Sequence, residues 1–267
     1  MVLDIQRYLD RIGYTGSREP TLETLRGLHR AHLCALPFEN LDIGLGNPIV
    51  LDEQAVFAKI VERRRGGFCY ELNGLFAALL RALGFRVTIL AAGVYSTKKA
   101  AFGPEFDHLA LRVDLERPWL TDVGFGDSFL YPLPLDTEAE QIDDGRAVPL
   151  VQSGDEGIWQ DRFRITGTAD TRTLQRRDGA GEWRDQYRLS LTPHRWADFT
   201  PMCQYHQTSP ESGFTRGSVC SLATVSGRVT VADRCLLITT GGEKRETILA
   251  DEAARTAALR DYCGITI

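Results

Sequence analysis

The sequence has no long apolar run, no block of like charge and no closely spaced cysteine pair among its 267 residues. A membrane-spanning helix needs about 20 consecutive apolar residues, and a secretory leader needs a shorter apolar core, so a cytoplasmic protein is expected. The net charge of −5 carries no basic patch, so neither nucleic acid nor a membrane surface is an expected partner. The composition, with 43% hydrophobic and 25% charged residues, is that of a globular protein.

The cysteines are few and scattered, and none forms a C-x-x-C motif. They occupy positions 34, 69, 203, 220, 235 and 263. This spacing indicates neither a disulfide scaffold nor a structural zinc site, so we expect reduced thiols and no bound metal. What remains open is whether one of these thiols is reactive.

The spacing of apolar residues changes along the chain and predicts an α+β protein with its helices first. Up to Leu83 apolar residues recur three or four positions apart, as on one face of a helix, and Gly84 supplies a stop. After Gly84, short apolar or alternating runs bounded by turn residues are typical of strands. A last helix is expected from Asp251 to Tyr262, capped by Asp251. The other helices are expected to begin near Ile5, Thr21, Asp52 and Cys69, and the strands at 85–95, 107–113, 118–123, 158–165, 171–176, 183–191, 219–225, 228–232 and 235–239.

The segment around Cys69 has the features of a reactive thiol. It reads R-R-G-G-F-C-Y-E-L-N-G over residues 64–74, and the helical pattern begins at the cysteine. The positive end of the helix and its free N–H groups would favour the thiolate, which is the nucleophilic form. The same N–H groups could stabilise an oxyanion during acyl transfer. The alternative is that Cys69 is a small buried residue at a tight turn.

A nucleophilic cysteine needs a base, and the base needs an orienting group. The runs 108–113 and 117–122 flank a short turn and predict an antiparallel hairpin. If residue 113 pairs with 117, His108 lies directly opposite Asp122 on the same face of the hairpin. Such a pair beside Cys69 would complete a catalytic triad, whereas the alternative is a structural His–Asp hydrogen bond. His29 and His32 fall on a helical pattern, where surface or half-buried positions are expected.

Five segments, taken in order, resemble the arylamine N-acetyltransferase family. They are A-H-L-C-A-L-P-F-E-N-L-D-I at 31–43, R-R-G-G-F-C-Y-E-L-N-G-L-F at 64–76, F-D-H-L-A-L around His108, T-D-V-G-F-G-D at 121–127, and P-M-C-Q-Y-H-Q-T-S-P-E-S-G-F-T-R-G-S-V-C-S-L-A-T at 201–224. The resemblance implies an N-terminal helical bundle over 1–84, a β-barrel-like middle domain over 85–190 and a C-terminal α/β lid over 191–267. The first two parts would form a papain-like or transglutaminase-like cysteine-enzyme core.

The resemblance also implies an activity, the acetyl-CoA-dependent N-acetylation of arylamines and arylhydrazines, with O-acetylation of arylhydroxylamines as an extension. The implied ping-pong mechanism has Cys69 as nucleophile, His108 as base and Asp122 as orienting carboxylate. Acetyl-CoA would be the acetyl-donor co-substrate, no cofactor would be bound permanently, and the protein would be a monomer or homodimer. An alternative of the same fold is an amide synthase acting on a carrier-bound acyl chain, and a third hypothesis is a non-catalytic binding module.

Further positions acquire roles only through this resemblance. Phe38 and Phe125 would form an aromatic acceptor slot, although core aromatic side chains are the ordinary alternative. Glu39 and Arg65 are expected to form an ion pair under the Cys69 turn, and Asn73 to support the site. The implied coenzyme contacts, which would otherwise be turn glycines and polar loop residues, are Gly124, Gly126, Ser128, Tyr205, Thr208 and Ser212.

Overall fold

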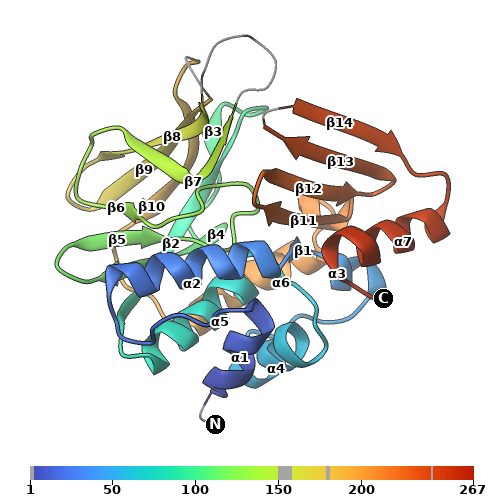
Figure 1. The fold of residues 1–267 in the computed structure, drawn as a ribbon, viewed down its shortest axis with the longest axis horizontal. Helices are drawn as coiled ribbons and strands as arrows, with labels where there is room; N and C mark the ends of the chain where they lie inside the picture. The colour runs from blue at the N-terminus through green and yellow to red at the C-terminus, as the bar shows by residue number, and fades with distance from the viewer. Residues whose placement is uncertain (1–2, 150–157, 179–180, 242) are drawn as a thin grey trace.

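The computed structural model describes residues 3–149, 158–178, 181–241 and 243–267, whose helices and two sheets are arranged as in Figure 1. Most of the helical residues lie before residue 83, as predicted. These helices are α1 (Ile5–Ile12), α2 (Leu22–Ala35), α3 (Leu41–Leu45), α4 (Glu53–Phe57), the π-helical turn Ala58–Glu62 and α5 (Cys69–Ala82). Two α-helices come later, α6 (Thr200–Thr208) and α7 (Glu252–Cys263). Among the described residues, no helix has the length and apolar composition needed to cross a bilayer.

Local sequence signals account for where several helices begin and end. The side chains of Thr21, Asp52 and Asp251 each accept a hydrogen bond from the backbone N–H three residues later, at the predicted helix starts. Gly13 ends α1 with a φ of 65°, in the left-handed region that glycine adopts without strain.

A strongly curved, nearly closed antiparallel sheet forms the barrel-like part of the fold (Figure 1). The strand order is β6-β5-β4-β2-β10-β9-β8-β7, and β3 pairs with β2. The strands are β2 (Arg86–Ser96), β3 (Ala101–Phe102), β4 (His108–Asp114), β5 (Pro118–Thr121), β6 (Leu133–Pro134), β7 (Gln141–Pro149), β8 (Ile158–Gly167), β9 (Thr171–Asp178) and β10 (Arg184–Ser190). Strand β7 was not predicted, because its sequence lacks alternation and its pairing with β8 shifts register between Asp143 and Val148.

The second sheet combines a short N-terminal strand with four strands from the C-terminal part. Its order is β1 (Phe38–Glu39), β11 (Val219–Thr224), β12 (Gly227–Ala232), β13 (Cys235–Thr240) and β14 (Glu243–Ile248), with α7 packed against β11 and β12. Strand β14 was also not predicted. Its residues are all exposed and mostly charged, as is usual for an edge strand, so no apolar face marks it in the sequence.

Helix α5 is the central element of the fold. All but one of its residues from Cys69 to Leu80 are buried, and it packs against β2 and β4 of the barrel-like sheet. Because this packing immobilises the helix along its length, the residue at its start is held in a defined place relative to the start of β4.

Candidate active site

Cys69 is the first residue of α5 and is buried. The turn before it approaches other backbone so closely that a side chain is excluded. A Cβ atom on Gly66 would stand 2.0 Å from the carbonyl oxygen of Pro37. The N–H of Phe68 donates to Glu71 Oε2 at 3.2 Å, which satisfies one of the free donors at the helix start.

A buried cluster of charges lies beneath this turn. The expected pair is confirmed, with Arg65 Nη2 2.9 Å from Glu39 Oε1. Lys59 Nζ lies 2.9 Å from Glu71 Oε1 and 2.8 Å from Asp42 Oδ2. Burial raises the pKa of Glu71 to about 7 against the attraction of Lys59. The cluster therefore joins the helix that starts at Cys69 to β1, α3 and the π-helical turn.

His108 and Asp122 are hydrogen-bonded, but through a different strand register from the one predicted. His108 Nε2 lies 2.7 Å from Asp122 Oδ2. The hairpin pairs Asp114 with Pro118 and Leu111 with Thr121, so the register is two residues away from the expected one. The reason is a turn at 115–117 rather than 114–116, with the Leu115 N–H bonded to the Arg117 carbonyl. Because a shift of two residues preserves the face, His108 still reaches Asp122, now along a diagonal.

The Asp122 carboxylate is fully buried and well supplied with donors. Its Oδ1 accepts from Asn73 Nδ2 at 2.8 Å and from the Gly124 N–H at 3.0 Å. Burial alone would raise the pKa of Asp122, but the hydrogen bonds and the influence of His108 outweigh it and lower the pKa. Asn73 also donates to the Leu109 carbonyl and accepts from the Val123 N–H, as its expected supporting place requires. Asp122 is therefore an ionised acceptor facing His108.

The electrostatics at Cys69 differ from the sequence-based expectation. Burial raises the pKa of the thiol well above its ordinary value, a hydrogen bond from the Leu109 backbone opposes this only in part, and the Asp122 charge adds to the increase. Burial therefore favours the neutral thiol over the thiolate at this position. A thiol in this environment needs a base to take its proton.

Aromatic rings surround the His108 imidazole. The Phe125 ring centre lies 5.2 Å from that of His108, and the Tyr187 ring centre lies 5.1 Å from it. Phe38, on β1, lies close to the same loop: a Cβ atom on Gly126 would be 3.6 Å from its ring. Sequence reasoning did not identify Tyr187, whose signal was only its place on the inner face of strand β10.

Five of the six residues expected to contact a coenzyme occupy two separate regions. Gly124, Gly126 and Ser128 follow Asp122, and Ser128 is buried with no hydrogen-bond partner for its hydroxyl among the described residues. Tyr205 and Ser212 line a cavity of about 570 Å³ together with Lys99, Asp107 and His206, among others. Asp107, one of the residues that line this cavity, directly precedes His108 in the chain.

Thr208 is not in either region. Its hydroxyl donates to the Gln204 carbonyl within α6 at 2.8 Å.

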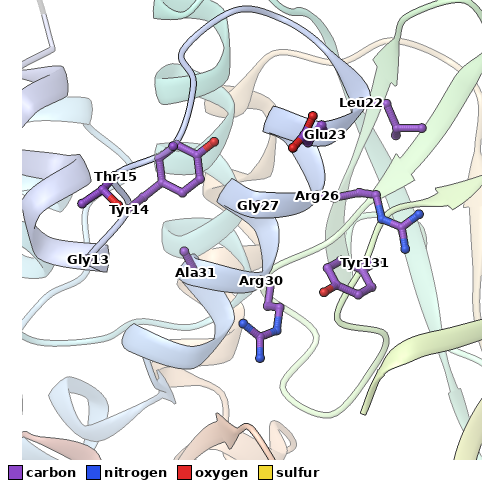
Figure 2. A pocket seen from close by; sticks show the side chains of 11 residues that line it. Gly13, Tyr14, Thr15, Leu22, Glu23, Arg26, Gly27, Arg30, Ala31 and Tyr131 are labelled. Carbon is purple, nitrogen blue, oxygen red and sulfur yellow. The ribbon is translucent and has the colours of Figure 1, made fainter. Parts of the chain in front are cut away.

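Another cavity, of about 760 Å³, lies between the loop after α1 and helix α2, and Figure 2 shows Arg26, Arg30 and Tyr131 at one end of it. Its lining includes none of Cys69, His108 and Asp122. Among the described residues, no group of three or more His, Cys, Asp and Glu side chains is placed to hold a metal ion.

The two helical histidines are buried, contrary to the surface or half-buried positions expected. Both His29 and His32 have no exposed area. His29 Nδ1 lies 2.8 Å from the Leu130 carbonyl oxygen, and its Nε2 lies 3.1 Å from the backbone nitrogen of Asp122. The helical pattern could not reveal this contact, because its partner is 93 residues away.

Comparison with known proteins identifies the family. A family model described as N-acetyltransferase matches residues 21–267. Human arylamine N-acetyltransferase 1 is 36% identical over 232 residues, which are 84% of this chain and 79% of the human protein. The arylamine N-acetyltransferase of Mycolicibacterium smegmatis is 35% identical over 260 residues, covering 96% of this chain and 89% of that protein.

Solved structures agree with these sequence relationships. The arylamine N-acetyltransferase of Salmonella typhimurium superposes with a TM-score of 0.88 at 30% identity, covering 99% of this chain and 92% of that chain. The Mycobacterium marinum arylamine N-acetyltransferase in complex with CoA gives a TM-score of 0.85 at 34% identity, covering 98% and 93%. The chain belongs to the arylamine N-acetyltransferase family, and the resemblance drawn from its segments is confirmed.

Proposed function

We propose that this chain transfers the acetyl group of acetyl-CoA to aromatic amines through an acetyl-enzyme formed on Cys69. The observation that carries the proposal is a buried thiol at the start of α5 that is hydrogen-bonded to the backbone of Leu109, the residue after His108, whose ring is itself hydrogen-bonded to Asp122. Family membership supports the reaction class, and the coenzyme A complex of the Mycobacterium marinum relative supports acetyl-CoA as the donor.

In the first half-reaction His108 takes the thiol proton while the Cys69 sulfur attacks the carbonyl carbon of the thioester. Because His108 Nε2 is held by Asp122, Nδ1 is the ring nitrogen assigned to this proton. The bond from the acetyl carbon to the coenzyme sulfur breaks, and that sulfur leaves with the proton from His108. One thioester replaces another, so the step has no large uphill component.

In the second half-reaction an amine nitrogen attacks the acetyl carbon on Cys69. The amine loses a proton to His108, the carbon–sulfur bond breaks, and the Cys69 sulfur recovers that proton. Aromatic amines and hydrazines are unprotonated at neutral pH, unlike alkylamines, and therefore keep the lone pair that attacks. The same acetyl-enzyme would transfer to the oxygen of an arylhydroxylamine.

The binding assignments form part of the same proposal. The rings of Phe38 and Phe125 would hold the aromatic acceptor, since Phe125 packs on His108 and Phe38 lies next to Gly126, the following residue of the same loop. Tyr205 and Ser212 would contact the coenzyme in the cavity of about 570 Å³, where Lys99 adds a positive charge for phosphate. Loop residues Gly124, Gly126 and Ser128, and helix residue Thr208, remain proposed coenzyme contacts.

The proposal extends to the domains of the chain. Residues 1–84 would be the helical bundle, 85–190 the barrel-like domain and 191–267 the lid, with the first two forming a papain-like or transglutaminase-like core. The presence of a thiol at a helix start and of a hydrogen-bonded His–Asp pair on the sheet that this helix packs against supports this comparison.

One experiment tests the proposal against its alternatives. The protein is incubated with acetyl-CoA without an acceptor, and intact mass and peptide mapping are expected to show one acetyl group on Cys69 that an added arylamine removes. Cys69→Ser is expected to lose this labile thioester adduct. An amide synthase would not be charged by free acetyl-CoA, and a binding module would form no adduct. Either of those results would overturn the proposed function.

A further inference from the structure

His29 projects from α2 into the core of the protein, away from solvent. Arg26 and Arg30 of the same helix extend toward the open cavity shown in Figure 2, whereas His29 has no exposed area. Its ring lies against Phe129 with a centroid distance of 5.6 Å and an interplanar angle of 10°, and edge-on to Phe76 at 6.2 Å. The imidazole is thus held in one orientation by packing.

The two ring nitrogens of His29 have opposite hydrogen-bonding roles. The Leu130 carbonyl oxygen, 2.8 Å from Nδ1, can only accept, so Nδ1 carries the hydrogen. The Asp122 backbone N–H, 3.1 Å from Nε2, can only donate, so Nε2 is the bare acceptor. Both contacts are satisfied by one tautomer of the neutral ring.

Asp122 needs this acceptor because it lies just past the end of its strand. The last pair of the β4–β5 hairpin joins Leu111 to Thr121, so no strand partner continues to Asp122. A buried backbone N–H without an acceptor is unfavourable, and His29 supplies that acceptor from a different element of the fold.

We propose that His29 is a positioning residue for acetyl transfer: by holding the Asp122 backbone, it aligns the carboxylate that orients His108. The inference rests on the proposed function, because Asp122 affects catalysis only if His108 removes the proton of Cys69. Both ring nitrogens of His29 are bonded to backbone groups, so it acts on the peptide bond between Thr121 and Asp122 rather than on the carboxylate, which has its own partners.

The test compares two substitutions at His29 by single-turnover acetylation of Cys69 with acetyl-CoA. His29→Leu removes both hydrogen bonds, whereas the His29→Gln side chain still offers an NH₂ group that can donate and a carbonyl oxygen that can accept. We expect the saturating rate for His29→Leu to fall about 100-fold, as for a small misplacement of a catalytic group, with the half-saturating acetyl-CoA concentration unchanged. For His29→Gln we expect a rate within a few-fold of wild type.

His32→Leu is the matched control. His32 lies one turn further along α2, is equally buried and also packs on Phe76, but its ring nitrogens have no hydrogen-bond partner among the described residues. This substitution is expected to leave the acetylation rate unchanged. A loss of rate equal to that of His29→Leu would show a general effect of emptying the helix core and would overturn the proposal.

Other outcomes separate this inference from the proposed function. If wild-type protein forms no acetyl adduct on Cys69, the proposed function fails, whatever the variants do. If wild type is acetylated and a folded His29→Leu variant reacts equally fast, only the positioning role fails. A wild-type ¹⁵N spectrum needs no substitution: it is expected to show a bare Nε2 coupled through the hydrogen bond to the Asp122 N–H. Absence of that coupling overturns the role even if His29→Leu does not fold.

Discussion

Gly124 lies directly on the start of the Cys69 helix: a Cβ atom at Gly124 would stand 2.8 Å from the Cα atom of Cys69. The same added atom would be 2.7 Å from Asn73 Nδ2, the group that holds the Asp122 carboxylate. The loop and the helix are therefore in backbone contact, and the distance between thiol and carboxylate depends on residue 124 having no side chain.

Gly124→Ala is expected to separate this loop from α5, because two of the three close neighbours are backbone atoms of Cys69 that cannot rotate away. The overpacking should destabilise the fold by about 1–3 kcal/mol and reduce the acetylation rate at least tenfold. Urea unfolding and single-turnover acetylation measure the two effects. Gly44→Ala, where an added Cβ atom meets nothing within 4 Å, serves as the control. It should leave the acetylation rate unchanged and, because Gly44 lies within helix α3, should not destabilise the fold. Equal behaviour of the two variants would contradict the packing argument.

Alkylation of Cys69 should reveal whether His108 acts as its base. Burial raises the pKa of the thiol, so Cys69 without a base should react only at alkaline pH, above the ordinary value of 9.0. We expect wild-type protein to react with iodoacetamide near neutral pH and His108→Gln to lose that neutral reactivity. The rate profile from pH 6 to 10, followed by intact mass, distinguishes the two. Superimposable profiles would rule out His108 as the base.

His29 should contribute to acid sensitivity. Burial lowers its pKa to about 4 from an ordinary 6.5. Between pH 6.5 and pH 4 the unfolded chain binds a proton at this residue and the folded chain does not, so acid favours unfolding. The contribution of neutral His29 to the free energy of unfolding is therefore complete above pH 6.5 and is lost as the pH falls toward 4. The pKa difference corresponds to about 3 kcal/mol. Urea unfolding between pH 4 and 7 should show a flatter pH dependence for His29→Gln than for wild type; parallel curves would contradict this assignment.

Lys59 should be far more important for stability than an exposed ion-pairing residue. Lys59→Met leaves Glu71 and Asp42 without their shared cation in a buried site, which is expected to cost about 3–5 kcal/mol. Arg117→Met, which removes the exposed ion pair with Asp136, should cost less than about 1 kcal/mol. Denaturant unfolding of both variants makes the comparison. A cost below 1 kcal/mol at Lys59 would show that the cluster does not support the helix start.

Much of the fold was predictable because local physics marks it. The caps at Thr21, Asp52 and Asp251 and the break at Gly84 identified helix boundaries without tertiary information. Strands β7 and β14 were not predicted, because β7 is irregularly paired and β14 lies exposed at the edge of its sheet. The periodic signal that identifies a strand requires one face to be buried.

The site was partly predictable for a similar reason. Side chains alternate between the two faces of a strand, so an error of two residues in the register leaves His108 and Asp122 on the same face. Their pairing was therefore correctly predicted, although the turn was placed one residue too early. The contacts of Asp122 with His29 and the packing of Tyr187 on His108 depend on how distant elements come together. The spacing of residues in the sequence therefore could not predict these two contacts.

The two-residue strand β1 has a consequence for the order in which the molecule is completed during synthesis. Phe38 pairs with Ser221 and Glu39 with Cys220, while the Glu39 side chain also anchors Arg65 below the Cys69 turn. These N-terminal residues can pair with Gly67 early, but they lack their antiparallel partners until the ribosome has made strand β11. Cys69 lies in the first third of the chain, yet the sheet that contains β1, next to the Cys69 turn, can form only when the last quarter of the chain has been synthesised.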